Sequence, residues 1–161
     1  MSRPILKSLT TLLTQAYLFI FVYLNRIMKI KYKIISDPAK IRKFALNHTG
    51  VILKSKVKNM GWKLKKLFLN EIKYNRKIMT KYRTQKLYRA KKELQIDLIK
   101  SGKKINPLIV MYENNWLVDG YARYAALEFF RIKKAMSYSG RYKDKKVKWD
   151  YRRKREILLS H

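Results

Sequence analysis

The chain has 161 residues, a length that suits one domain with an additional arm or tail. Its hydrophobic content of 47% suffices for a core and excludes wholesale disorder. Because 40 Lys and Arg residues stand against 10 Asp and Glu, the formal charge of +30 favours a polyanionic partner: DNA, RNA or an anionic membrane. The Lys-rich composition also fits the codon bias of an AT-rich genome, but that bias does not account for so few acids. The lack of cysteine excludes disulfides, thiol catalysis and Cys-based metal sites, and two histidines are too few for a His-rich metal site.

An uncharged segment lies near the N-terminus, at residues 8–25, with basic residues on both sides. It approaches the roughly 20 residues of a membrane helix, but its leucines also share one face at helical spacing. A signal peptide is the weakest interpretation because no small-residue cleavage site follows, and a translation start at Met28 is a fourth one. We divide the chain into a hydrophobic segment (1–27), a domain (28–140) and a basic tail (141–161). We expect a cytoplasmic protein, associated with membranes only if the hydrophobic segment is an anchor.

The domain begins with a predicted strand and helix. Residues 29–35 alternate Lys with Ile and Tyr, which is the period of a half-exposed strand. Residues 38–47 predict a helix, with Pro38 at the first helical position. Residues 51–57 fit either a second strand or a loop.

Two further helices are expected before the middle of the chain. Residues 61–79 place their apolar side chains on one side and lysines on the other, which predicts an amphipathic helix. Residues 80–102 predict a longer helix that ends at Gly102. Its apolar face is expected to contain Leu87, Leu94, Leu98 and Ile99.

The second half of the domain reads as a strand–turn–strand–helix–strand unit. The predicted strands are 105–112, 116–119 and 135–139, and the helix is 121–132. The tail is expected to form an amphipathic helix over 149–159.

The junction between strand 116–119 and the following helix carries the chemistry of a helix N-terminus. Backbone N–H groups without intrahelical partners, together with the helix dipole, bind phosphate readily there. Gly120 permits close approach of a ligand, and Arg123 places a guanidinium beside the same anion. Asp119 is either the N-cap or a ligand to a hydroxyl or metal. The alternative is structural: Asp119 caps, Gly120 turns the chain and Arg123 is a surface residue.

The order of motifs around this junction resembles a known superfamily. A basic helix ending in "KSG", the strand "INPLIV", a hairpin turn, "NWLVDGYARYAALEFFRI" and a closing strand resemble the ParB/sulfiredoxin superfamily, in its ParB-like nuclease-domain branch. The resemblance covers residues 81–139. It implies an α/β (α+β) fold, a small mixed sheet with packed helices, here with basic N- and C-terminal extensions.

The resemblance also implies a phosphate-binding box formed by Asp119, Gly120, Tyr121 and Arg123. Members bind DNA or nucleotides, and many are plasmid or phage proteins. The resemblance thus leaves CTP or ATP with Mg²⁺ as a candidate cofactor of this chain, and no cofactor follows from the residues alone. This sequence carries Ala122 where members often have His or Arg, and Tyr121 where partition proteins have Glu. These departures argue against an active CTP switch or a kinase-type mechanism. The missing cysteine excludes the reductase activity, and no helix-turn-helix follows the box.

Two Lys- and Arg-rich segments are interleaved with aromatic residues, as in proteins that hold phosphates with cations and stack bases on rings. The first comprises Lys81, Arg83, Lys86, Arg89, Lys91 and Lys92. The second lies in the tail and comprises Arg141, Lys143, Lys145, Lys146, Lys148, Arg152 and Arg153. The tail would also suit anionic lipid or a ribonucleoprotein, and the first segment also fits a solvated helix face with buried tyrosine rings.

Three functions follow from these features. The favoured one is binding of DNA or RNA with little sequence preference, because no base-reading side chains are evident. The second is a nuclease or nucleotide-phosphate hydrolase with Asp119 as a catalytic residue. An enzyme is the less favoured class, because Glu113 and Glu128 are not expected to converge with Asp119 on a metal. The third is a membrane-tethered or ribonucleoprotein scaffold with a relic site. The sequence leaves open whether the chain forms a homo-oligomer.

Overall fold

The computed structural model describes residues 29–48, 60–111, 114–143, 147–150 and 155–158. The chain divides into two units, Met1–Ile30 and Lys31–His161, and the description below concerns the second. The hydrophobic segment 8–25 and the strand-or-loop segment 51–57 lie outside the described residues. Among the residues that are described, no helix is long and apolar enough to cross a membrane.

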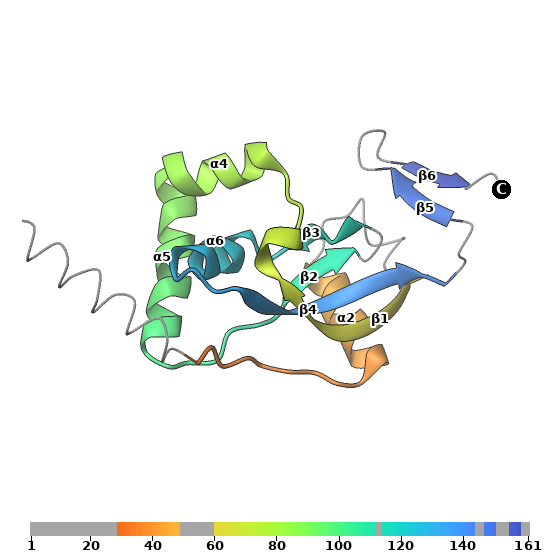
Figure 1. Cartoon of the computed structure of the whole chain (residues 1–161), viewed down its shortest axis with the longest axis horizontal. Coiled ribbons are helices and arrows are strands. Elements are labelled where there is room, and N and C mark those ends of the chain that lie inside the picture. The colour runs from red at the N-terminus through yellow and green to blue at the C-terminus, as the bar shows by residue number, and fades with distance from the viewer. Residues whose placement is uncertain (1–28, 49–59, 112–113, 144–146, 151–154, 159–161) are drawn as a thin grey trace, which may run out of the picture. The chain divides into compact units, whose positions relative to one another are not determined.

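A four-stranded mixed sheet forms the centre of the second unit (Figure 1). Its strands lie in the order β1-β4-β2-β3, with β4 antiparallel to β1 and parallel to β2, and β3 antiparallel to β2. The strands are β1 (Met60–Phe68), β2 (Leu108–Met111), β3 (Trp116–Asp119) and β4 (Lys134–Tyr142). The helices around it are α2 (Pro38–His48), α4 (Arg76–Thr84), α5 (Lys86–Lys100) and α6 (Tyr121–Phe129). The predicted α/β fold, a small mixed sheet with packed helices, is confirmed.

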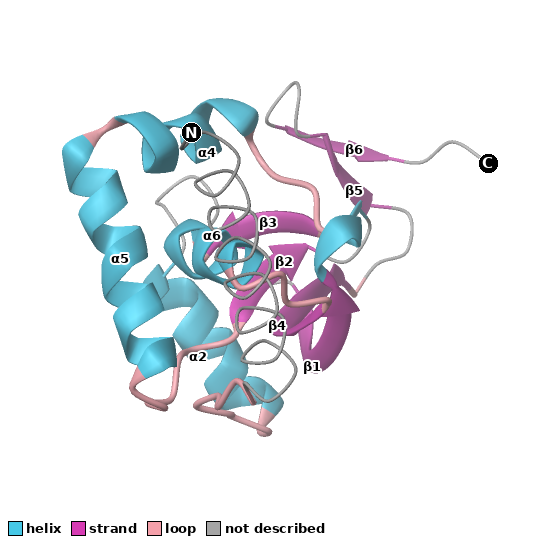
Figure 2. Cartoon of the chain, turned by 60° about the vertical axis from the view of Figure 1, so that its left-hand side comes forward, coloured by secondary structure: helices cyan, strands magenta, loops and turns pink. Residues whose placement is uncertain are grey.

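The helices form two groups. Helices α4, α5 and α6 pack against one another, whereas α2 packs against β1 (Figure 2). Helix α2 begins at Pro38 as predicted. The Asp37 carboxylate stabilises this start, because it accepts a hydrogen bond from the Ala39 N–H at 2.8 Å. The predicted strand 29–35 is reduced to a single parallel bridge between Tyr32 and Ile105.

The predicted helix over 61–79 is wrong. Its first part is strand β1, followed by the short 3₁₀ helix η1 (Leu69–Glu71) and then by α4. Met60 and Trp62 are buried, whereas the residues between and after them, Gly61 and Lys63, are exposed. The segment therefore follows the period of two of a strand, and its pairing with β4 decides between two patterns that the local sequence allows.

The predicted helix over 80–102 is broken at Gln85, which has the extended torsions φ −97° and ψ 130°. Helix α5 ends before Gly102, whose φ of +66° confirms its role as the left-handed residue after the helix. The predicted apolar face is wrong in part, because Leu87 and Leu94 are 66% and 58% exposed. Helix α5 is buried through Ile96 and Ile99 instead.

The predicted tail helix over 149–159 is also wrong. Strands β5 (Val147–Asp150) and β6 (Arg155–Leu158) pair antiparallel, with Val147 opposite Leu158. The sequence Val-Lys-Trp-Asp alternates apolar and charged residues, which is the period of a strand.

The core on the α2 side of the sheet combines residues of α2 with alternate residues of three strands. Ile41 packs in one cluster with Trp62, Ile109 and Tyr138. Leu108 alternates with Ile109 along β2 and therefore points to the opposite face, where it adjoins Gly120 at the start of α6. This placement fixes the junction of β3 and α6 against the central strand.

Candidate functional site

The junction of β3 and α6 contains a β-bulge and a left-handed glycine. On β2 the partners Ile109 and Val110 are adjacent, but they face Asp119 and Leu117, so β3 contains one extra residue at that point. A bulge of this kind redirects the side chains that follow it. The next residue, Gly120, is the N-cap of α6 with φ 98° and ψ 24°. The N-cap is thus Gly120, and the N-cap role considered for Asp119 is wrong.

Gly120 is required by its surroundings as well as by its torsions. A Cβ atom at this position would lie 2.8 Å from Nη2 and 3.0 Å from Nε of Arg123, and 3.0 Å from Cδ2 of Leu108. The Arg123 guanidinium therefore lies directly across the glycine backbone. The close approach that the sequence predicted at Gly120 is occupied here by the protein's own cation.

Arg123 is held by Asp119 and is largely buried. Its Nη2 donates to Asp119 Oδ2 at 2.9 Å, and its side chain is 11% exposed. Its Nε is buried and has no hydrogen-bond partner among the described residues. A guanidinium has five N–H donors in a fixed fork, so Arg123 retains donors for an anion.

The backbone of α6 adds further donors beside this guanidinium. The Tyr124 N–H bonds to the Gly120 carbonyl at 2.8 Å, so the preceding N–H groups of Tyr121, Ala122 and Arg123 have no partner within the helix. The N-cap residue, Gly120, has no side chain that could cap them. Three backbone donors and one guanidinium thus lie at one helix end.

Tyr121, predicted as part of the phosphate-binding set, has a different use for its side chain. Its hydroxyl accepts from the Asn75 N–H at 3.1 Å and donates to the Leu117 carbonyl at 3.3 Å. Burial raises the pKa of Tyr121, so the hydroxyl stays protonated at neutral pH. The ring is buried and fixes the start of α4 against β3. Only the backbone of Tyr121 faces the helix end.

Two further tyrosines connect this junction to α5. The ring of Tyr82 stacks on Tyr121 with centroids 6.3 Å apart, and Tyr88 meets Tyr82 edge-on at 5.1 Å. Burial is the main cause that raises the pKa of Tyr82, and the charge of nearby Asp119 adds to it. The sequence shows Tyr interleaved with Lys and Arg. The Tyr82–Tyr88 contact, however, depends on the break between α4 and α5 at Gln85, which the sequence did not predict.

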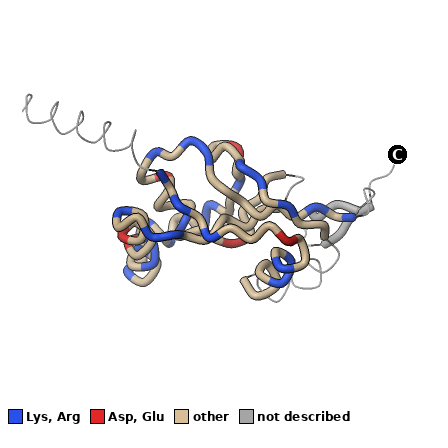
Figure 3. Tube along the Cα trace, turned by 90° about the horizontal axis from the view of Figure 1, so that it is seen from below, with Lys and Arg blue, Asp and Glu red and all other residues tan. Residues whose placement is uncertain are grey.

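The basic residues predicted to bind nucleic acid fall into described and undescribed groups. Along α4 and α5, Lys81, Arg83, Lys86, Arg89 and Lys91 are exposed and Lys92 is half-buried. Figure 3 colours the Lys and Arg positions blue along the chain trace. Arg83 pairs with Glu128 at 3.7 Å. In the tail, Arg141 and Lys143 are exposed, Lys148 belongs to β5, and Lys145, Lys146, Arg152 and Arg153 lie outside the described residues.

Acidic side chains do not gather at the junction. The described residues contain no group of three or more metal-ligating side chains. Asp119 and Glu128 lie near opposite ends of α6, a helix of nine residues that spans about 13 Å. Glu113 lies outside the described residues.

No protein-family model matches the chain, and no curated protein matches it. Two structures of a pNOB8-like ParB N-domain align with TM-scores of 0.41 and 0.38, at 17% and 20% identity. Each alignment covers 52% of this chain, which spans only 31% and 29% of theirs. Sulfiredoxin from Arabidopsis thaliana aligns with a TM-score of 0.36 at 18% identity, over 47% of this chain and 82% of its own. The chain is thus similar in structure, at low sequence identity, to ParB N-domains and sulfiredoxin, the resemblance that its motif order predicted.

Proposed function

We propose that the protein binds DNA or RNA, mainly through backbone phosphates and with little sequence preference. The proposal is supported by the charge of +30 and by its distribution. Helices α4 and α5 carry nine Lys and Arg residues against two acids. Cations of this number and exposure neutralise phosphates and release their counterions.

The observation that carries the proposal is that two lysine ammonium groups lie near the ring of Tyr88. The Nζ atoms of Lys81 and Lys91 lie 5.6 Å and 5.5 Å from the centroid of its ring. Tyr88 is half-buried, so part of its ring remains accessible. A ring flanked by two ammonium groups suits a base stacked on the ring, with the adjacent phosphates held by the cations.

The junction of β3 and α6 extends this surface. The chain of ring contacts from Tyr88 through Tyr82 ends at Tyr121, the first residue of α6 and two residues before Arg123. A phosphate at the start of α6 would accept from the backbone donors there and from Arg123, in place of the bond to Asp119. Arg123 would then be a phosphate-binding residue, and Asp119 the carboxylate that the phosphate displaces.

The test compares two double variants of equal charge. Lys81→Ala/Lys91→Ala removes the two cations at Tyr88. Lys40→Ala/Lys43→Ala removes two exposed lysines of α2, a helix that packs against β1. Binding of a labelled 20-base-pair duplex is followed by fluorescence anisotropy over a series of salt concentrations. If both lysines contact phosphates, the slope of log K against log salt falls in magnitude by about 1–2 in the first variant.

The α2 variant is the control, with a slope close to that of the wild type. Equal effects of the two variants would mean that the duplex responds to net charge alone. That result would overturn the α4–α5 surface as the binding site.

A nucleotide offers the same phosphate chemistry at the same helix end, so calorimetric titration with CTP, ATP and GTP at moderate salt tests a second function. Saturable binding that is lost in Arg123→Ala would support a nucleotide site.

Metal-dependent hydrolysis is tested with Mg²⁺ and Mn²⁺, and cleavage abolished by Asp119→Asn would support the enzyme. Inertness with both metals would contradict it.

A further inference from the structure

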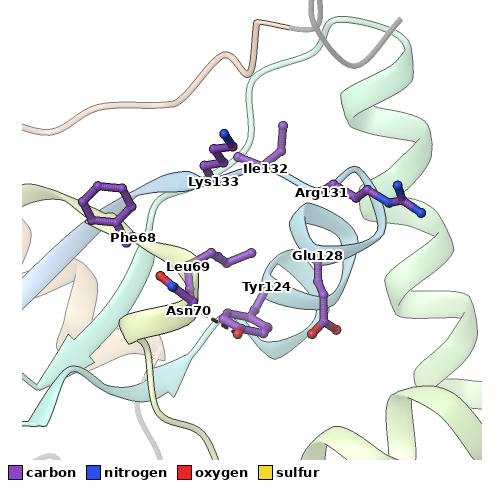
Figure 4. Close-up of a pocket in the computed structure, with 8 residues that line it drawn as sticks. All are labelled: Phe68, Leu69, Asn70, Tyr124, Glu128, Arg131, Ile132 and Lys133. Atoms are coloured by element: carbon purple, nitrogen blue, oxygen red, sulfur yellow. Dashed lines mark hydrogen bonds between the residues drawn. The ribbon is translucent and has the colours of Figure 1, made fainter. Parts of the chain in front are cut away.

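A pocket of about 500 Å³ lies between η1 and the end of α6, away from the Gly120 junction (Figure 4). Its charged side chains are Glu128, Arg131 and Lys133, and their head groups point in different directions (Figure 4). Glu128 also pairs with Arg83, at 3.7 Å. The charges of the pocket therefore do not converge on one ligand. A set of charges that does converge lies beyond the end of α5.

This second set is assembled from two segments that are far apart in the sequence. It is called the lysine cluster below and comprises Lys31, Lys33, Lys103 and Lys104. None of these lysines belongs to the phosphate-binding box or to helices α4 and α5.

A parallel bridge between Tyr32 and Ile105 holds the two segments together. In it the Lys33 N–H donates to the Ile105 carbonyl at 2.9 Å, and the Ile105 N–H donates to the Lys31 carbonyl at 3.0 Å. Tyr32 is half-buried and Ile105 is buried, so the two bridged residues face the interior. Because side chains alternate along an extended segment, Lys31, Lys33 and Lys104 face the opposite side, toward solvent.

The turn after α5 adds Lys103 to these three lysines. Its N–H donates to a carbonyl of the last turn of α5 at 2.9 Å, across the left-handed Gly102. A Cβ atom at Gly102 would lie 3.7 Å from Nζ of Lys31, so this ammonium group lies at the turn that carries Lys103. All four lysines are exposed, and no ion pair joins any of them to another described residue. The helix dipole favours a cation at the end of α5, which accounts for Lys31 but not for Lys33 or Lys104.

The composition of the cluster restricts its partner to a surface of anionic groups. All four cations are lysines, which carry compact charges without the planar fork of arginine. Tyr32, the aromatic residue of these two segments, has a buried hydroxyl, and burial raises its pKa. The cluster therefore offers no exposed ring on which an unpaired base could stack.

The position of the cluster along the chain favours lipid as the source of these anions. In the sequence, residues 26–30 alone separate Lys31 from the uncharged segment 8–25. Four or more basic residues close to an apolar segment are typical of proteins that bind anionic lipid. Here the sequence supplies Lys31 and Lys33 next to that segment, and the fold adds Lys103 and Lys104.

We propose that the lysine cluster binds the surface of an anionic lipid bilayer. The four ammonium groups would lie against the lipid phosphates, and the attraction would weaken with salt because the charges are exposed. This inference does not rest on the proposed nucleic-acid binding, because the α4–α5 surface and the lysine cluster share no residue.

The experiment measures how the full chain partitions into sedimented vesicles at about 0.15 M salt. One set of vesicles contains phosphatidylcholine alone, and in the other about 30% of it is replaced by phosphatidylglycerol. Partition into the neutral vesicles reports the uncharged segment, so the ratio of the two partition coefficients reports the charges. The wild type is expected to prefer the anionic vesicles on the order of a hundredfold.

Lys33→Gln/Lys103→Gln/Lys104→Gln removes three charges of the cluster and leaves Lys31 at its turn. Each lysine near an anionic surface contributes about fivefold, so this variant is expected to lose at least about tenfold of the preference for anionic vesicles. Its partition into neutral vesicles is expected to stay the same. Circular dichroism verifies that the variant is folded.

The matched control removes the same number of charges from exposed lysines of α2 and β1. It is Lys40→Gln/Lys43→Gln/Lys66→Gln. The control is expected to change the preference for anionic vesicles by less than about threefold, because charges farther than a Debye length from the bilayer are screened.

Duplex affinity, measured for both triple variants, separates lipid from nucleic acid. Loss of the lipid preference in the cluster variant but not in the control supports the proposal, whether or not the chain binds the duplex. Equal partition of the wild type into both sets of vesicles, or equal effects of the two triple variants, would overturn it. The proposal also fails if the cluster variant keeps its lipid preference and loses more duplex affinity than the control, because the cluster would then belong to the nucleic-acid interface.

Discussion

Gly120→Ala is the substitution whose effect follows most directly from the geometry of the junction. The residue has φ 98°, in the left-handed region where a Cβ meets the backbone. The added Cβ would also lie 2.8 Å from Nη2 of Arg123 and 3.0 Å from Cδ2 of Leu108. The arginine end is flexible, but Leu108 is fully buried in the central strand and has little room to move.

The expected loss of stability combines the backbone strain at Gly120 with the close contact to Leu108. A non-glycine residue in this backbone conformation costs about 1–2 kcal/mol, and pressing a methyl group into the packed Leu108 side costs about another 1–2 kcal/mol. We therefore expect the free energy of unfolding to fall by roughly 2–4 kcal/mol, and the melting temperature to fall by roughly 5–15 °C.

The assay is urea unfolding followed by circular dichroism, with Gly61→Ala as the control. A Cβ at Gly61 would meet only the Arg141 carbonyl oxygen, at 3.9 Å, and no positive φ is involved. The control is expected to stay within about 1 kcal/mol of the wild type. In an Arg123→Ala background, Gly120→Ala should cost up to about 1 kcal/mol less, because two of the three close contacts are gone. Equal stability of Gly120→Ala and Gly61→Ala would refute the reasoning.

Further predictions concern the core and the tyrosines. In Gly140→Ala the new Cβ would lie 2.7 Å from the buried Trp62 ring, so we expect a loss of about 1–3 kcal/mol in urea unfolding; unchanged stability would contradict this packing. Tyr121→Phe removes the acceptor of the Asn75 N–H and should cost about 1 kcal/mol in the same assay, whereas no change would mean that the hydroxyl contributes nothing. Burial, and secondly the charge of Glu128, raises the pKa of Tyr124 to about 12, so the folded chain retains a proton that the unfolded chain releases near pH 10. Tyr124 therefore stabilises the folded chain fully below pH 10, and this stabilisation is lost as the pH rises towards 12. Between these pH values the free energy of unfolding of Tyr124→Phe should fall by about 1–2 kcal/mol less than that of the wild type. Parallel curves of stability against pH would exclude this role.

Local signals explain why the second half of the sheet was predicted and the first was not. Strand β3 and helix α6 meet at Asp-Gly, a turn signal between two clear periodicities. The predicted strand 116–119 agrees with β3, and α6 begins at Tyr121 as predicted but ends at Phe129, before the predicted end at residue 132. Strand β1 pairs with β4 far along the chain, and its run of Lys and Leu fits both periods, so only the partner decides.

The candidate site divides in the same way. Asp119 and Arg123 are four residues apart, a spacing that places both on one side of a helix end, and the sequence located them together. The Tyr82–Tyr88 contact and the pocket beside Glu128 arise from helix–helix packing and from the turn that follows α6, for which the sequence carries no periodic signal.

The central claim is that a phosphate binds Arg123 by displacing the Asp119 carboxylate from it. The most direct measurement compares duplex affinity in Asp119→Asn and Arg123→Ala at one moderate salt concentration, after both are shown to be folded. The account predicts opposite signs: Arg123→Ala weakens binding because the guanidinium is lost, and Asp119→Asn strengthens it because the guanidinium no longer has a competing carboxylate. If Asp119→Asn weakens binding as Arg123→Ala does, or if neither variant changes it, the ion pair is purely structural and the claim is contradicted.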